Sequence, residues 1–291
     1  MCYNSAMDKQ TNIKAVVVLS GGQDSATCLA LAVKKHGAGT VAAITFKYGQ
    51  RHQIETKYAR RLAKRFGVKT HNVVAMDFYR HLTSNALMNP DVKIERRTGS
   101  TCPTTVVEGR NAMFLLAAGV WAKSLGATEI YTGVSQADFS GYPDCRRVFI
   151  RAQERMMRLA MEWPFKIVTP FMNMSKADEW ALADKLGILD VIKYETVTCY
   201  NGVPGTGCGK CPSCKLRNKG LQEFEQRAKR KYPPRLLRRQ EETAVACAEP
   251  GDIGLRLGTV DFSFASGLGD GSELAAGTPD EDIVRHRGHR G

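Results

Sequence analysis

A strand–turn–helix segment near the N-terminus constrains the fold of this chain more than any other feature. It reads KAVVVLSGGQDSATCLALAVKK over residues 14–35. The nearly continuous apolar run is typical of a parallel strand that helices cover on both faces. Gly21 and Gly22 then allow the backbone to turn sharply into the helix that follows. The segment therefore predicts the first unit of an α/β sheet.

Apolar runs and amphipathic stretches alternate along the rest of residues 14–190, which is typical of βαβ units. We predict strands over residues 14–19, 41–46, 70–75, 129–133 and 166–169. We predict helices over residues 25–36, 53–66, 110–125, 147–162 and 176–186. The fold class is α/β, with a doubly wound, mostly parallel, five-stranded sheet. Periodicity does not fix the order of its strands.

Three segments do not follow this alternation of predicted strands and helices. Residues 78–106 form a long polar insertion, either a lid over a site or a mobile surface loop. Residues 191–232 carry a cysteine cluster and a C-terminal helix, and we expect them to bind zinc. Residues 235–291 are rich in Gly and acidic residues without a sustained pattern, so we expect a disordered tail.

The turn after the first strand has the properties of a phosphate-binding loop. Backbone N–H groups at the start of a helix attract phosphate, because they are unpaired and lie at the positive end of the helix dipole. Ser20 and Ser25 add hydroxyl donors, while Asp24 can cap the helix or help to hold Mg²⁺ on the phosphates. The spacing is that of neither a Walker loop nor a dinucleotide fingerprint. The alternative is an ordinary turn with an Asp cap. The predicted ATP-binding residues are Leu19, Ser20, Gly21, Gly22, Gln23, Asp24, Ser25, Ala26, Thr27, Cys28 and Leu29.

Four of the nine cysteines form a second motif. Cys199 is followed by Cys208, Cys211 and Cys214 within GCGKCPSCK. Four thiolates at this spacing can surround one structural zinc ion, and the neighbouring Lys210, Lys215 and Arg217 would offset its negative charge. A redox pair, an iron–sulfur cluster and ordinary buried cysteines are the alternatives.

The net charge of +13 is unevenly distributed. Residues 235–291 hold seven Arg and Lys against ten Asp and Glu, which leaves +16 on residues 1–234. A basic body suits phosphate-rich partners such as ATP or RNA, or is a solvated surface that favours solubility. No apolar run reaches about 18 residues, and the first residues lack the apolar stretch of a signal peptide. We therefore expect no membrane partner and a cytoplasmic location.

The loop SGGQDS resembles that of the N-type ATP pyrophosphatases, which implies an adenine nucleotide alpha hydrolase-like fold and cleavage of ATP between its α and β phosphates. Six further strings, in order over about residues 14–222, make the chain similar to the 7-cyano-7-deazaguanine synthases. The strings are YGQRH, GRNAMFLLAA, GYPDCRRVFI, PFMNMSKADEW, TCYNG and CGKCPSCKLRNKG. The tail lies outside this resemblance.

The resemblance implies that ATP drives the conversion of 7-carboxy-7-deazaguanine and ammonia into a nitrile, through an adenylated acid and an adenylated amide, for queuosine synthesis. It also implies a homodimer and no stable nucleic-acid binding. Lys176 resembles a lysine that steadies the phosphates as pyrophosphate departs. The alternative for this residue is a surface lysine at a helix start.

Substrate contacts are expected at two places. Arg110 begins a helix after Gly109 and can pair with a carboxylate or phosphate, and Asn111 offers an amide beside it. In the loop after the fourth strand, Asp138 or Asp144 can accept from the deazaguanine ring, and Tyr142 or Phe139 can stack on it. Each is otherwise a turn residue. The predicted catalytic set is Ser20, Asp24, Ser25, Lys176 and Arg110.

Arg51 and His52 are expected near the adenine or the insertion. Two positions depart from the family pattern: Glu108 replaces a usual proline, and Lys47 replaces a usual acidic residue. These departures leave room for a related substrate.

Two other functions remain open. One is a tRNA thiolase of the same superfamily, for which Cys28, Cys102 and Cys145 are candidate reactive thiols. The other is a zinc module without enzymatic activity, against which the intact phosphate loop argues.

Overall fold

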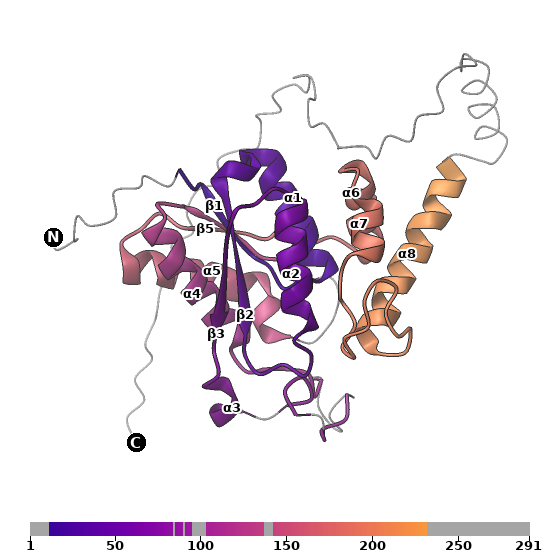
Figure 1. The fold of residues 1–291 in the computed structure, drawn as a ribbon, viewed down its shortest axis with the longest axis horizontal. Coiled ribbons are helices and arrows are strands. Elements are labelled where there is room, and N and C mark those ends of the chain that lie inside the picture. Colours follow the sequence, from indigo (N-terminus) through magenta and orange to yellow (C-terminus); the bar gives the residue numbers. More distant parts are fainter. Residues whose placement is uncertain (1–11, 84, 90, 95–102, 137–141, 232–291) are drawn as a thin grey trace, which may run out of the picture. The chain divides into compact units, whose positions relative to one another are not determined.

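Five strands form a single, fully parallel sheet in the order β3-β2-β1-β4-β5 (Figure 1). The strands are β1 (Ala15–Val18), β2 (Val41–Lys47), β3 (Thr70–Ala75), β4 (Glu129–Tyr131) and β5 (Lys166–Val168). Each overlaps a predicted strand, so the predicted fold class is confirmed. The order reverses between β1 and β4, and in such sheets ligands bind beyond the carboxyl ends of the strands at that point.

The structure is a computed structural model that describes residues 12–83, 85–89, 91–94, 103–136 and 142–231. All of them belong to one of the two units into which the chain divides, Met1–Arg239. The predicted tail, most of which forms the other unit, lies outside the described residues, as do Cys102, Asp138 and Phe139.

Helices cover both faces of the sheet, with α1 and α2 on one face and α4 and α5 on the other (Figure 1). The main helices are α1 (Gln23–His36), α2 (Ile54–Arg65), α4 (Arg110–Ser124), α5 (Arg147–Met161), α6 (Lys176–Lys185), α7 (Leu189–Tyr194) and α8 (Pro212–Lys231). Shorter turns are η1 (Ala38–Thr40), α3 (Tyr79–Leu82) and η2 (Pro143–Cys145).

Strand β1 shows how the alternation of side chains divides the core. Ala15 and Val17 pack into the cluster beneath α1, α2, α6 and α7, whereas Val16 packs into the cluster beneath α4 and α5. All three are fully buried, which explains why the strand is apolar at every position. This double burial fixes β1 at the centre of the sheet and directs its carboxyl end into the phosphate loop.

The C-terminal part of the described chain packs against the domain through α6. Helix α8 lies along α6, and Trp180 of α6 donates its indole N–H to the Arg217 carbonyl of α8 at 3.2 Å. Arg217 itself is buried, and its guanidinium lies 5.0 Å from the Trp180 ring centre. The segment that carries the four cysteines, residues 195–214 and here called the cysteine segment, is thereby held beside the sheet rather than at the end of a free linker.

Candidate active site

A cavity of about 560 Å³ lies beyond the carboxyl ends of β1, β2 and β4. Its walls come from the phosphate loop, the starts of α4, α6 and α8, the insertion and the cysteine segment. The residues used below that line it are Leu19, Ser20, Gly22, Gln23, Asp24, Ser25, Tyr48, Arg51, His52, Glu55, Thr105, Arg110, Asn111, Gly133, Tyr142, Cys145, Lys176, Thr198, Tyr200, Ser213 and Arg217. Its place at the reversal of strand order is where α/β sheets bind ligands.

Two serine hydroxyls close the phosphate loop on itself. Ser20 Oγ lies 3.0 Å from Ser25 Oγ, and Ser25 Oγ donates to the Gly22 carbonyl at 3.0 Å. Gly21 has a φ of 91°, and a Cβ there would lie 2.6 Å from the Glu55 carbonyl oxygen. Only glycine fits that backbone and that spacing. The result is a tight turn whose hydroxyls and N–H groups lie at the start of α1.

Six of the eleven predicted ATP-binding residues line the cavity. Gly21 and the four residues Ala26, Thr27, Cys28 and Leu29 do not, and those four are buried within α1. The physical reason is helical geometry, because residues beyond the first turn point into the core under the sheet. The predicted stretch therefore extends one turn further into the helix than the cavity does.

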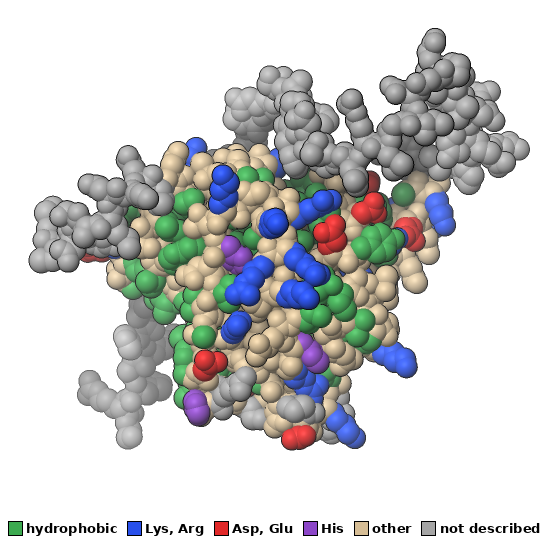
Figure 2. Space-filling view, viewed as in Figure 1, with side chains coloured by type: hydrophobic (Ala, Val, Ile, Leu, Met, Phe, Trp, Pro, Cys, Tyr) green, Lys and Arg blue, Asp and Glu red, His purple; other side chains and the backbone are tan. Residues whose placement is uncertain are grey.

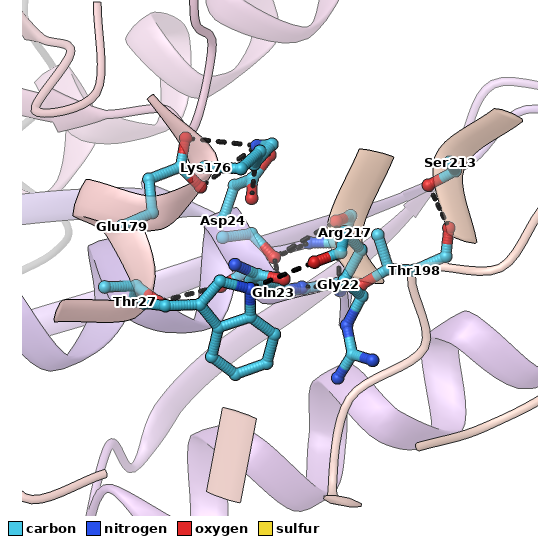
Figure 3. A network of polar contacts seen from close by, with 12 residues as sticks. Gly22, Gln23, Asp24, Thr27, Lys176, Glu179, Thr198, Ser213 and Arg217 are labelled. Carbon is cyan, nitrogen blue, oxygen red and sulfur yellow. Dashed lines mark hydrogen bonds and ion pairs between the residues drawn. The ribbon is translucent and has the colours of Figure 1, made fainter. Parts of the chain in front are cut away.

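Lys176 links the start of α6 to the phosphate loop (Figure 3). Its Nζ donates to both carboxylate oxygens of Asp24 at 3.0 Å and to those of Glu179 at 3.1 and 3.0 Å. Burial, followed by the nearby Asp24 charge, raises the pKa of Glu179. Ser175 forms a capping box with Asp178, which fixes where α6 begins. Lys176 is thus held at the cavity wall by two acids from different elements.

A close approach of β4 to α1 brings Asp24 to this position. A Cβ on Gly133 would lie 2.8 Å from Asp24 Cβ and 3.0 Å from its backbone carbonyl carbon. The first distance is shorter than contacts that real Cβ atoms make and the second is unusually tight, so a side chain at Gly133, two residues beyond β4, would displace the start of α1.

Arg110 occupies a wall formed by aromatic and acidic side chains. Its Nη1 donates to the Tyr48 hydroxyl at 3.2 Å, and its guanidinium lies 5.6 Å from the centre of that ring. Glu55 faces the same space, and burial raises the pKa of its carboxyl to about 7, against the opposing charge of Arg110. The cavity therefore holds a fixed cation and an acid that titrates near neutral pH.

In the loop before α5, Tyr142 lines the cavity, whereas Asp144 contacts the start of α4. Tyr142 lines the cavity and its hydroxyl lies 2.5 Å from Thr105 Oγ1 and 3.3 Å from the Tyr200 hydroxyl. Asp144, by contrast, accepts from the Asn111 N–H at 3.0 Å at the start of α4 and does not line the cavity. Its carboxylate caps that helix, and its predicted contact with substrate stays a prediction.

Arg51 and His52 of the YGQRH segment contact two other walls of the cavity, the insertion and the cysteine segment. Arg51 donates to the carbonyls of Asn89 and Val92 at 3.0 and 3.1 Å, which anchors the insertion. A Cβ on Gly202 would lie 2.6 Å from His52 Cγ, so the imidazole packs on the backbone of the cysteine segment. The predicted position of Arg51 at the insertion agrees with these contacts.

The four predicted cysteine ligands come together. Their sulfur atoms all lie within 4.8 Å of one another, with Cys199 and Cys208 each 4.0 Å from one partner. Tetrahedral zinc–sulfur bonds of about 2.3 Å would place thiolates roughly 3.8 Å apart, so the cluster has the size that a metal ion requires. The Cys211 and Lys210 N–H groups lower the pKa of the Cys208 thiol to about 6. The cluster can therefore hold a metal ion.

The remaining described cysteines are poor nucleophiles. Cys28 is fully buried, and this burial raises the pKa of its thiol. Cys145 lines the cavity, but burial, together with the Asp144 charge, raises the pKa of its thiol to about 12. Since the thiolate is the reactive form, neither residue supports the sulfur-transfer alternative.

Three residues that the sequence analysis missed also shape the site, namely Glu55, Glu179 and Thr198. Glu179 follows Lys176 by three positions, a spacing that brings side chains together on a helix and could have indicated the pair. Glu55 and Thr198 approach the loop from distant segments, and local sequence carries no signal for that.

Lys and Arg side chains gather on the surface over α2 (Figure 2). The exposed basic residues of this helix are Lys57, Arg60, Arg61, Lys64 and Arg65. This solvated face carries part of the surplus positive charge of residues 1–234. Among the described residues, no helix combines the length and the apolar character that crossing a membrane requires.

Comparisons with known proteins identify the family. The family described as queuosine biosynthesis protein QueC matches residues 14–225. The 7-cyano-7-deazaguanine synthase of Clostridium acetobutylicum is 48% identical over 213 residues, which cover 73% of this chain and 95% of that protein.

Solved structures that resemble the chain are more distant. They include an NH3-dependent NAD synthetase from Campylobacter jejuni, with 14% identity and a TM-score of 0.37 over 85% of this chain and 91% of the other. An NMN synthetase from Francisella tularensis has 14% identity and a TM-score of 0.40 over 75% and 86%. The family match and the 48% identical relative decide the assignment: the chain belongs to the queuosine biosynthesis protein QueC family.

Proposed function

We propose that the chain is an ATP-dependent carbon–nitrogen ligase that converts 7-carboxy-7-deazaguanine and ammonia into 7-cyano-7-deazaguanine, in queuosine biosynthesis. The observation that carries this proposal is the 48% identity to a protein of that name over nearly its whole length. The cavity supports it, because a phosphate loop, a lysine and an arginine line one space of a size that suits small molecules.

The chemistry explains why ATP is needed. A carboxylate becomes a nitrile by losing two oxygens, and each is a poor leaving group until it is activated. In the first activation, a carboxylate oxygen attacks the α-phosphorus of ATP and pyrophosphate leaves. The hydroxyls of Ser20 and Ser25 and the N–H groups of the loop would bind the departing phosphates. Lys176 would add a positive charge as the negative charge on them grows.

The same site would then serve a second activation. Ammonia attacks the acyl carbon, AMP leaves with one former carboxylate oxygen, and a proton passes to water. The amide oxygen attacks the α-phosphorus of a second ATP, again releasing pyrophosphate. Loss of AMP and of the two N–H protons leaves the carbon–nitrogen triple bond. Since no protein nucleophile is needed, the chain's contribution is positioning and charge stabilisation.

Magnesium would accompany ATP. Asp24 is the carboxylate of the loop that could hold the ion, and it currently shares its oxygens with Lys176. A carboxylate plus phosphate oxygens is a normal ligand set for Mg²⁺. Binding would therefore require Asp24 to exchange part of its contact with Lys176 for the ion, which frees the ammonium to follow the phosphates.

Substrate recognition would use the opposite wall of the cavity. The guanidinium of Arg110 can pair with the substrate carboxylate or the α-phosphate, and the Asn111 amide lies beside it. Tyr142 can lie against the flat ring. Asp144 would act indirectly, because it holds the start of α4 through Asn111.

Zinc is the metal that suits the cysteine cluster. The residues Cys199, Cys208, Cys211 and Cys214 would fill all four tetrahedral positions, so the ion would be structural. In domain terms, residues 14–190 would form the ATP-binding domain and residues 191–232 the zinc-binding segment with its helix. We also propose a cytoplasmic homodimer, for which light scattering of the purified protein provides the check.

The direct test is incubation of the purified chain with ATP, ammonium and 7-carboxy-7-deazaguanine, followed by mass spectrometry of the base. The expected product is the nitrile, with the amide as an intermediate. An unchanged acid alongside a folded, metal-loaded protein would overturn the assignment. RNA affinity measured against salt tests the thiolase alternative, for which the proposal expects no steep salt-dependent binding.

A further inference from the structure

The cysteine segment reaches the phosphate loop directly through two neighbouring residues. The Val197 N–H donates to the Gly21 carbonyl at 2.8 Å. The Gln23 N–H donates to Thr198 Oγ1 at 3.1 Å, across 175 positions of sequence (Figure 3). One residue of the loop thus gives its carbonyl, and another its N–H, to the segment that runs into Cys199.

The Gln23 N–H is a group that needs a partner. Gln23 is the first residue of α1, and the first N–H groups of a helix have no acceptor within the helix. The residue before it, Gly22, has no side chain to supply one. An N-cap side chain accepts from the N–H of the second or third helical residue. The acceptor of this first N–H, the Thr198 hydroxyl, comes instead from another part of the chain.

Thr198 is fixed in turn by the first turn of α8. Ser213 Oγ donates to the Thr198 carbonyl at 2.7 Å. Ser213 lies between Cys211 and Cys214, and Thr198 directly precedes Cys199. Both partners of this hydrogen bond are therefore neighbours of the four thiols, so the position of the Thr198 hydroxyl depends on the folding of the cysteine cluster.

We propose that Thr198 is a positioning residue that holds the first turn of α1 in the shape that takes the phosphates of ATP, and that it couples the cysteine cluster to nucleotide binding. The inference rests on the proposed function insofar as the loop binds ATP. Thr198 acts through the Gln23 N–H rather than on the reacting atoms. The cysteine segment thus has a role at the active site beyond its own folding.

The test is equilibrium binding of α,β-methylene-ATP, which this type of reaction cannot cleave, to the full chain with Mg²⁺. Thr198→Val keeps the shape of the side chain and removes the acceptor of the Gln23 N–H. We expect its Kd to be about tenfold higher, the size of one lost hydrogen bond to a buried donor. Thr198→Ser keeps the hydroxyl and should bind as the unaltered chain does. Metal content should be unchanged in both variants.

Equal affinity of the unaltered chain and Thr198→Val would overturn the inference alone, as would equal weakening in the Val and Ser variants. If the chain itself does not bind the nucleotide, the proposed function fails and the inference fails with it. Should Thr198→Val not fold, Ser213→Ala provides a second route. It removes the anchor of the Thr198 carbonyl and leaves the hydroxyl, so severalfold weaker binding is expected and unchanged binding would contradict the coupling.

Discussion

The ammonium nitrogen of Lys176 lies 3.0 Å from both carboxylate oxygens of Asp24, a contact that joins α6 to the phosphate loop across 152 positions of sequence. Glu179 accepts from the same nitrogen at 3.1 and 3.0 Å. Because two acids share one cation, a bound nucleotide that draws the ammonium toward its phosphates would leave Asp24, which lines the cavity, able to help hold Mg²⁺. The loop and α6 therefore function as one unit.

Lys176→Met should abolish pyrophosphate release and also lower stability. It leaves Glu179 buried beside Asp24 without a cation, and breaking a buried pair in this way typically costs about 3–5 kcal/mol. Adding Glu179→Gln should restore much of the stability without restoring activity. Chemical denaturation and a pyrophosphate assay separate the two effects. Lys185→Met, which alters an exposed lysine at the other end of α6, is the matched control. An equal loss of pyrophosphate release and of stability in this control would contradict the role assigned to Lys176.

Asp24→Asn should reduce turnover by at least about 100-fold, because the loop loses the charge proposed to hold Mg²⁺ and to orient Lys176. Ser25→Ala should act in the same direction through loss of the hydroxyl that closes the loop. Asp184→Asn, on the exposed side of α6, serves as control. Steady-state kinetics at saturating ATP provide the measurement, and a fully active Asp24→Asn enzyme would rule out the role of this carboxylate.

Gly133→Ala should weaken nucleotide binding without touching the loop sequence. The added Cβ would meet the backbone of Asp24 and Ser25 within about 3 Å, so the start of α1 has to shift. Gly39→Ala is the control, because a Cβ there meets no atom within 4 Å. We expect the control to bind α,β-methylene-ATP normally; normal binding by Gly133→Ala would show that the loop tolerates the displacement.

Cys211→Ser should lose the metal and most of the soluble protein, since metal-binding free energy contributes directly to folding. Cys145→Ser, which alters a cysteine outside the cluster, should keep both. Metal analysis of the purified proteins gives the readout. A folded Cys211→Ser enzyme with full activity would contradict a structural role for the ion.

Glu55 predicts a specific dependence of stability on pH. Burial raises the pKa of its carboxyl to about 7, so the folded chain retains a proton that the unfolded chain releases near pH 4.5. The folded state is therefore favoured at low pH, and this contribution is lost as pH rises from about 4.5 through 7. Glu55→Gln should remove that dependence. Denaturation midpoints at pH 5 and pH 8 give the comparison, and parallel pH profiles for the two proteins would contradict the raised pKa.

The sheet was predictable because its signals are local. Strand β1 is buried on both faces and therefore apolar at each position, and α6 starts at a capping box that is visible in the sequence. All five strands and the five long helices before the cysteine segment overlap the predicted ranges. The short helix α7 was not predicted, because its six residues are too few to show a helical period.

The walls of the site were only partly predictable. The phosphate loop and the four cysteines are defined by close spacing, whereas Thr198 and Glu55 reach the loop through packing of distant segments. Arg217 was predicted to offset thiolate charge, and although burial lowers the pKa of its guanidinium, the charge of Cys214 does act in the opposite direction and raises it. Its contacts with the Ile192 and Lys193 carbonyls at 3.0 Å come from packing and had no signal in the sequence. The sequence also did not indicate that Asp144 accepts from the Asn111 N–H across the fold, and its predicted contact with substrate stays a prediction.

The most direct measurement of the central claim follows the carboxylate oxygens of the substrate. With 7-carboxy-7-deazaguanine labelled with ¹⁸O at both carboxylate positions, mass spectrometry of the nucleotide products reports where each oxygen goes. Two activations at the phosphate loop predict two AMP molecules per nitrile, each carrying one ¹⁸O, and unlabelled pyrophosphate. Label in inorganic phosphate, with ADP as the nucleotide product, would contradict attack at the α-phosphorus and the role assigned to the loop.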